Sequence, residues 1–351
     1  MDCKGSAFAG VQGQSPWAWT KSAFSLSSAE ITPGLIVRCS SHTLAAMLRY
    51  ALRRLALAIL VTVTVLVISF ALTRLSGDLA ASIAGPDATA EDIAIIRKEY
   101  GLDRPLTVQF FDWARRAAEG DLGDSYLYHA PVSGLVATRL PITLTLGGVG
   151  LVFALAIALP LGILAALYEG SAIDRLLSLV ALIGQAMPSF WLGLLLIIWF
   201  GLDLHWLPIS GVEDWTGYIL PGFVLSFSAI PALLRLMRTG MIEALGSDYI
   251  RTARAKGLSA RSIVLKHALR NAAMPVVAVG AVQLGFMLGG SIVVEEVFAL
   301  HGVGYLAWES VSKNDFPVVQ AVVLLLAVIY IALTLLADLC NAALDPRLRS
   351  R

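Results

Sequence analysis

The 351-residue sequence has few charged residues, few cysteines and almost no net charge. Only 15% of its residues are charged, compared with about 25% in ordinary soluble domains. Cys3, Cys39 and Cys340 form no Cys-x-x-Cys pair, so neither a zinc site nor a disulfide framework is indicated. The net charge of +1 provides no basic field that would recruit nucleic acid.

Apolar residues dominate the composition. They make up 57% of the chain, and the mean hydropathy of +0.76 excludes a water-soluble globule, a disordered chain and a collagen-like chain. A bilayer core requires about 20 mostly apolar residues per helix. We therefore predict an all-α polytopic membrane protein with six transmembrane helices, at residues 55–75, 142–167, 176–200, 218–236, 275–298 and 318–339.

The distribution of Lys and Arg beside these spans predicts the orientation of the chain. Eight Lys and Arg residues lie from Arg235, at the end of span four, to the start of span five, whereas the connection 201–217 has none. Both termini are therefore expected in the cytoplasm. The expected organisation is a cytoplasmic start and first span, a periplasmic segment, a five-span core and a cytoplasmic tail, at residues 47–75, 76–141, 142–340 and 341–351.

The first 46 residues differ from the rest of the chain. They are rich in Ser, Gly and Ala, show no periodicity and contain no apolar run of signal-peptide length. We expect residues 1–46 to be a disordered or mis-annotated extension, with translation beginning at Met47.

The periplasmic segment has helix signals of its own. Thr89 and Asp92 suit the two ends of a capping box, and Gly101 suits the position after a helix. A second helix is expected at residues 108–118, ended by Gly120. The segment either caps the protein or provides a docking surface for a soluble partner.

The cytoplasmic connection between spans four and five predicts a short exposed helix. Ser247 and Asp248 suit its N-cap, and Gly257 suits the residue after its end, where φ is positive. Spacing places four residues on one face, which we interpret as a docking face for another protein: Tyr249, Thr252, Ala253 and Lys256. A second helix is expected to start at Ser259 and to lead into span five. Basic charge alone is uninformative here, because topology demands it.

Two segments of this connection carry a family resemblance. The sequences are DYIRTARAKGLS at 248–259 and KHALRNA at 266–272. They resemble the cytoplasmic signature of bacterial ABC importer permeases, specifically the permease with the large periplasmic loop in the dipeptide/oligopeptide/nickel branch. Further matches are GLDRP at 101–105, GDLG at 120–123, MPSFWLG at 187–193 and VVE at 293–295. The chain departs from the branch at Ser76–Leu79 and at His301–Gly304, both of which we place outside the membrane.

The resemblance implies a type I ABC importer permease fold and a transport role in the inner membrane of a bacterium. In such importers the short cytoplasmic helix, here within the coupling segment 241–271, inserts into a cleft of an ATPase subunit. The expected partners are a second homologous permease, two ATPase subunits, a periplasmic or lipid-anchored substrate-binding protein and membrane lipid. The residues implied in ATPase coupling are Asp248, Tyr249, Arg251, Thr252, Ala253, Arg254, Ala255, Lys256 and Gly257.

The chain is not expected to act as an enzyme or to hold a cofactor or metal. It has no Gly-x-x-x-x-Gly-Lys-Ser/Thr loop, so ATP and Mg are assigned to the partner ATPases. No histidine lies in mid-span and no Gly-x-Ser-x-Gly elbow occurs, which disfavours an intramembrane serine protease. A self-contained secondary transporter is disfavoured because the spans contain almost no charge and show no clear repeat.

The translocation pathway and the substrate are less constrained by sequence. Met187, Pro188 and Ser189 suit a kink that either lines the pathway or serves packing. Glu295 is a possible pathway residue, although an interfacial anchor is the favoured role for it, as for Arg238. The glycines 280, 285, 289 and 290 favour close helix packing over a filter. Within the family, di- or oligopeptides are the expected substrates, with nickel or another small solute as the alternative.

Overall fold

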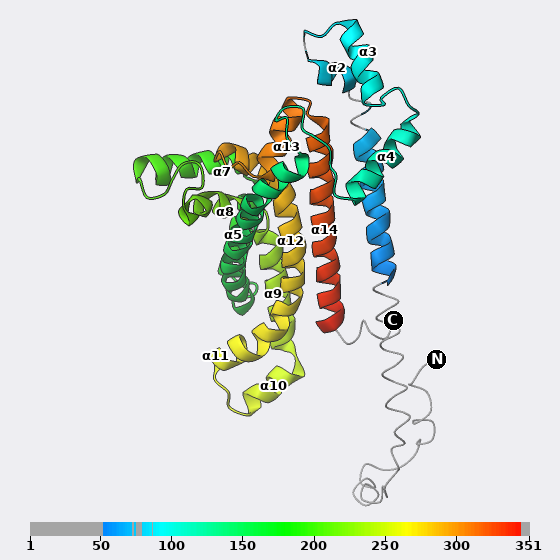
Figure 1. The fold of residues 1–351 in the computed structure, drawn as a ribbon. Helices are drawn as coiled ribbons and strands as arrows, with labels where there is room; N and C mark the ends of the chain where they lie inside the picture. Colours follow the sequence, from blue (N-terminus) through cyan, green and yellow to red (C-terminus); the bar gives the residue numbers. More distant parts are fainter. Residues whose placement is uncertain (1–51, 72–73, 75–78, 86, 345–351) are drawn as a thin grey trace, which may run out of the picture.

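The computed structural model describes residues 52–71, 74, 79–85 and 87–344. These residues form helices and loops, with a single β-bridge between Asp124 and Pro131 and no strand. Our expectations for residues 1–46, for translation from Met47 and for Cys3 and Cys39 fall outside the described residues. The all-α class predicted from the sequence is confirmed for the described part (Figure 1).

In the part of the chain that the structure describes, four helices are long and apolar enough to cross a membrane as single elements. The first is Leu52–Ala71, and the second is α5 (Val132–Leu167), which begins ten residues before the predicted span. The third runs without interruption through Ala260–Val297 and contains α11 (Ala260–Ser262), the π-helical η4 (Ile263–Ala268) and α12 (Leu269–Val297). The fourth is α14 (Phe316–Leu344), which stands beside α12 in Figure 1.

Predicted span three is not one helix. It consists of α6 (Ala172–Ala186), followed after a break by α7 (Ser189–Leu196) and the π-helical η2 (Ile197–Asp203), with a bend of 98° between the two halves. Pro188 has no N–H to donate to the preceding turn, and it forces Met187 into extended backbone. The expected kink is present, and its size corrects the prediction of a continuous helix.

Predicted span four is also divided. The 3-10 turn η3 (Trp215–Tyr218) and α8 (Ile219–Ser226) are bent by 65° from α9 (Ile230–Gly246). Pro231 lies in the first turn of α9, where its missing N–H costs least. The hydroxyl of Ser228 donates to the carbonyl of Leu225 at 2.9 Å. This carbonyl therefore has a hydrogen-bond partner although the helix is interrupted there. If each bent pair is one span, the described residues contain six spans.

The core lies where α5, α9 and α12 pack together. Leu146, Leu233 and Met237 are fully buried there. Gly162 allows close approach, because a Cβ at this position would lie 2.7 Å from the Cβ of Met237. The predicted packing role holds for Gly285, which faces Tyr330. It does not hold for glycines 289 and 290, which have no atom within 4 Å of an added Cβ.

Short helices gather at the two ends of this bundle (Figure 1). One end, called the α13 end, carries α2 (Leu79–Ala84), α3 (Ala90–Glu99), α4 (Leu106–Ala118) and α13 (Val303–Ser312). The opposite end, called the α10 end, carries α10 (Asp248–Ala255) and α11.

The helix signals predicted in the segment before α5 are confirmed. Thr89 and Asp92 form the capping box at the start of α3, with the Thr89 N–H donating to Asp92 Oδ2 at 3.0 Å. Gly101 and Gly120 follow α3 and α4 with φ of 62° and 88°. Helix α13 was not predicted.

Candidate functional site

Helix α10 is attached to the bundle by two apolar residues. Ile250 is fully buried and Ala253 nearly so, and both belong to the core cluster that includes Met241 of α9 and Ile263 of η4. Gly257 ends the helix with φ of 73°, as predicted, and the N–H of Leu258 returns to the carbonyl of Ala253 at 3.3 Å. The helix is therefore short and capped, and only the side with Ile250 and Ala253 packs against the bundle.

The outward surface of α10 is polar and small. Its exposed residues are Asp248, Tyr249, Arg251, Thr252, Arg254, Ala255 and Lys256. The predicted docking face needs one correction, because Ala253 points into the protein together with Ile250, three residues earlier. The phenol oxygen of Tyr249 accepts a hydrogen bond from Asn271 Nδ2 at 2.9 Å, which ties the exposed face to the start of α12.

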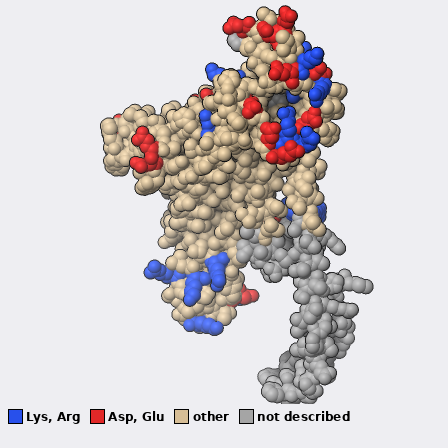
Figure 2. All heavy atoms as spheres, viewed as in Figure 1, with Lys and Arg blue, Asp and Glu red and all other residues tan. Residues whose placement is uncertain are grey.

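Positive charge collects at the α10 end. In the view of Figure 2, several Lys and Arg side chains lie on the surface of this end, with little acidic surface among them. The exposed pair between Arg251 and Asp248, at 3.2 Å, is a surface contact that contributes little to stability. The arrangement offers exposed cations around a helix whose last residue, Ala255, is small and exposed.

A bidentate ion pair joins α6 to α9. Arg238 Nε and Nη2 donate to the two carboxylate oxygens of Asp174, each at 2.7 Å. The N–H of Gly170 donates to the same carboxylate at 3.0 Å, and Asp174 is buried. Arg238 thus joins two helices, and its role as an interfacial anchor stays a prediction.

Glu295 is fully buried near the end of α12. Its carboxylate accepts hydrogen bonds from the Thr143 hydroxyl and from the Tyr305 N–H, each at 2.8 Å. The Thr143 oxygen in turn accepts from the N–H of Val303, so the carboxylate and this hydroxyl hold the first turn of α13. These contacts describe an intramolecular anchor, and a pathway role for Glu295 stays a prediction.

Glycine makes this anchor possible. A Cβ at Gly302 would lie 2.5 Å from Thr143 Oγ1 and 2.6 Å from Glu295 Oε2, and a Cβ at Gly304 would lie 3.0 Å from the same carboxylate oxygen. Larger residues would push α13 away from the carboxylate. Sequence reasoning missed this unit, because Thr143 is 152 residues from Glu295 in the chain.

The other predicted pathway residues lie at the 98° bend. Pro188 is exposed, and Met187 and Ser189 are half-buried. Nearby, a Cβ on Gly184 would lie 2.7 Å from the ring of Phe227, so the bend after α6 adjoins the break between α8 and α9. Lining of the pathway by these residues stays a prediction.

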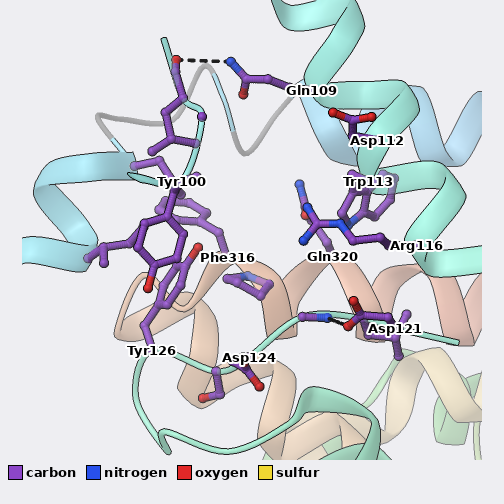
Figure 3. A pocket seen from close by; sticks show the side chains of 18 of the residues that line it. Tyr100, Gln109, Asp112, Trp113, Arg116, Asp121, Asp124, Tyr126, Phe316 and Gln320 are labelled. Carbon is purple, nitrogen blue, oxygen red and sulfur yellow. Dashed lines mark hydrogen bonds between the residues drawn. The ribbon is translucent and has the colours of Figure 1, made fainter. Parts of the chain in front are cut away.

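The α13 end contains a pocket of about 1020 Å³ (Figure 3). Its walls come from Arg74, from the end of α3, from α4, from the loop 121–129 and from the start of α14. Asp315 fixes the loop, since its carboxylate accepts from the Ser125 hydroxyl at 2.5 Å and from the N–H of Tyr126 at 3.2 Å. Burial raises the pKa of Tyr126 to about 12, so the phenol remains neutral in this wall.

Comparison with known proteins identifies the family. The family described as "Binding-protein-dependent transport system inner membrane component" matches residues 158–350, and the family for the N-terminal part of such components matches residues 47–147. The chain belongs to this family. The predicted resemblance is confirmed: this is a bacterial ABC importer permease of the peptide/oligopeptide type.

Close relatives within the family carry one name. The "Glutathione transport system permease protein GsiC" of Salmonella typhimurium is 43% identical over 305 residues, which cover 86% of this chain and 99% of the relative. The protein of the same name from Escherichia coli K12 is 42% identical over the same length. Among solved structures, an inward-facing form of the MetNI methionine ABC transporter matches with a TM-score of 0.49 and 21% identity, over 60% of this chain and 96% of that chain.

Proposed function

We propose that this permease forms half of a translocation pathway and couples ATP hydrolysis by partner subunits to the uptake of short peptides. The observation that carries the proposal is α10, a capped helix seated by Ile250 and Ala253 with a polar, exposed outer surface. Helix α10 lies within residues 158–350, which match the family of binding-protein-dependent transport components. This supports α10 as the element that contacts an ATPase cleft.

The proposed orientation puts the α10 end in the cytoplasm and the α13 end outside. The basic surface at the α10 end supports this, because Lys and Arg concentrate on the cytoplasmic side of membrane proteins (Figure 2). The ATPases then meet α10, and a substrate-binding protein meets the helices α2–α4. ATP and Mg are bound by the ATPases, and this chain performs no bond chemistry.

We propose peptides as the substrate class, with tripeptides tested first. Glutathione is itself a tripeptide, and the relatives named for its transport align over nearly their whole length. Nickel receives no local support, since the described residues contain no group of three His, Cys, Asp or Glu side chains that could hold a metal ion.

The proposal is tested by purifying the tagged chain from its native host in mild detergent and identifying every companion by mass spectrometry. We expect two ATPase subunits with phosphate-binding loops, a second six-span permease and a soluble binding protein. The purified complex, reconstituted in vesicles with ATP, should take up labelled glutathione or trialanine. A chain that remains alone under conditions that preserve other membrane complexes would contradict the proposal.

A further inference from the structure

The pocket at the α13 end brings charges of both signs around one concave surface. It is lined by four arginines (Arg74, Arg104, Arg115 and Arg116) and by four carboxylates (Glu99, Asp112, Asp121 and Asp124). Small-molecule sites usually have volumes of about 300–1,000 Å³, so a pocket of about 1020 Å³ accommodates a peptide of a few residues. The balanced charge favours a ligand that carries a positive and a negative group.

One wall is a single face of α4. Gln109, Asp112, Trp113 and Arg116 follow the i, i+3, i+4, i+7 spacing, and all four line the pocket. In Figure 3 the Arg116 side chain reaches from α4 into the pocket beside Trp113. Arg116 forms no ion pair with any described residue, so its guanidinium is available to a carboxylate.

The facing wall supplies carboxylates and aromatic rings. Asp121 and Asp124 lie on the loop after α4, and Tyr100 and Tyr126 lie near each other at the side of the pocket (Figure 3). Asp121 is partly engaged, because one of its oxygens accepts from the N–H of Gly123 at 2.9 Å. Asp124 forms no ion pair among the described residues, and it can receive an ammonium group.

A buried polar atom at the pocket also lacks a partner. Gln109 is more than nine-tenths buried, and its amide nitrogen donates to the carbonyls of Leu102 and Arg104. Its amide oxygen accepts no hydrogen bond from any described residue. Because this oxygen is itself buried, Gln109 shapes the wall of the pocket, and the contacts to an occupant come from the exposed charged residues.

We propose that this pocket binds a short zwitterionic peptide, with the peptide carboxylate on Arg116 and its ammonium group on Asp124. The peptide then meets the permease outside the membrane before it enters the pathway. The aromatic side chains Trp113, Tyr100 and Tyr126 provide surface for the peptide side chains. The inference rests on the proposed function and gives this chain a substrate contact of its own.

The test measures peptide binding to the purified full-length chain, alone and in its complex, by titration calorimetry. The probes are trialanine, trialanine amide and N-acetyl-trialanine, which differ only in their terminal charges. We expect trialanine to saturate one site and each blocked peptide to bind about tenfold more weakly, since each loses one charged contact.

Variants assign the two ends of the peptide. Arg116→Gln should abolish the preference for trialanine over its amide, and Arg116→Lys should restore part of it. Asp124→Asn should abolish the preference for trialanine over the N-acetyl form. Arg97→Gln, on α3 outside the pocket lining, is the matched control and should behave as the natural chain does. A purely structural role would lower all affinities together and leave the preferences intact.

Two results would overturn the inference. The first is the absence of saturable trialanine binding to the chain. The second is binding whose end-group preference survives both Arg116→Gln and Asp124→Asn. If Arg116→Gln instead weakens attachment of the soluble binding protein while trialanine does not bind, the pocket is a protein-docking surface and the peptide assignment is wrong. Uptake by the reconstituted complex, measured separately, shows whether the proposed function stands when the pocket inference fails.

Discussion

The α10 end and the α13 end of this protein are fixed by different interactions. Helix α10 is held by the apolar side chains of Ile250 and Ala253, and its polar residues face outward. Helix α13 is held by the buried carboxylate of Glu295, which accepts hydrogen bonds from distant parts of the chain. Apolar contacts tolerate small shifts of a helix, whereas buried hydrogen bonds demand one geometry. The difference suits a helix that transmits movement at one end and a rigid frame at the other.

The largest effect is expected at the α13 end. Glu295→Leu would leave the Thr143 hydroxyl and the Tyr305 N–H without an acceptor in a buried site, at a cost of about 4 kcal/mol. We expect a clear fall in the melting temperature of the purified chain. Glu295→Gln keeps an acceptor oxygen and should lower the melting temperature much less. Equal stability of the leucine variant and the natural chain would show that the buried carboxylate does not hold α13.

The next effect tests the apolar seat of α10. Ile250→Ala removes a fully buried side chain, at a cost of about 3 kcal/mol. Because the loss is local, we expect the ATPases to be lost from the purified complex while the partner permease remains. Leu258→Ala, at an exposed leucine of the same end, is the control and should retain the ATPases. If both variants retain them, α10 does not depend on this seat.

A smaller effect is expected at the end of α10. Gly257→Val places a β-branched residue at φ of 73°, which costs on the order of 1 kcal/mol or more. Uptake should fall although the protein reaches the membrane in normal amounts. Gly246→Val is a matched control, since neither glycine has an atom within 4 Å of an added Cβ and only Gly257 has positive φ. Normal uptake by the Gly257 variant would contradict a coupling role for this helix.

The smallest effect is expected in the capping box of α3. Thr89→Ala removes the side chain that exchanges hydrogen bonds with Asp92, so the first turn of α3 should open more often. Hydrogen exchange should become several-fold faster in α3, with little change in uptake. Thr107→Ala, at an exposed threonine of α4, should leave exchange in α3 unchanged. A large loss of uptake from Thr89→Ala would mean that the α13 end is coupled to transport more tightly than we infer.

The sequence predicts the elements that local chemistry decides. Apolar runs locate the spans, the pair Thr89 and Asp92 marks the start of α3, and Gly257 marks the end of α10. Pro188 signals a kink, but the 98° bend depends on how the two halves pack against other helices, which no local pattern contains.

The missed features join residues that are far apart in the chain. The anchor of α13 links residues 143, 295 and 305, and the pocket joins α4 to the loop 121–129 and the start of α14. The spacing of Gln109, Asp112, Trp113 and Arg116 on α4 was a signal available in the sequence. That these four residues line a pocket could not be predicted, because the opposite wall is formed by residues distant in the chain. The inward turn of Ala253 was similarly decided by its packing with Ile250.

Site-specific cross-linking tests the central claim that the exposed surface of α10 contacts the ATPases. Ala255 of α10 and Ala118 of α4 are both exposed alanines at the ends of short helices, one at each end of the molecule. Each would be replaced by cysteine in a complex whose permease has its three native cysteines removed. A short bifunctional reagent should join the Ala255→Cys chain to an ATPase and should not join the Ala118→Cys chain to one. Absence of an ATPase adduct at position 255, or equal adducts at both positions, would contradict the account.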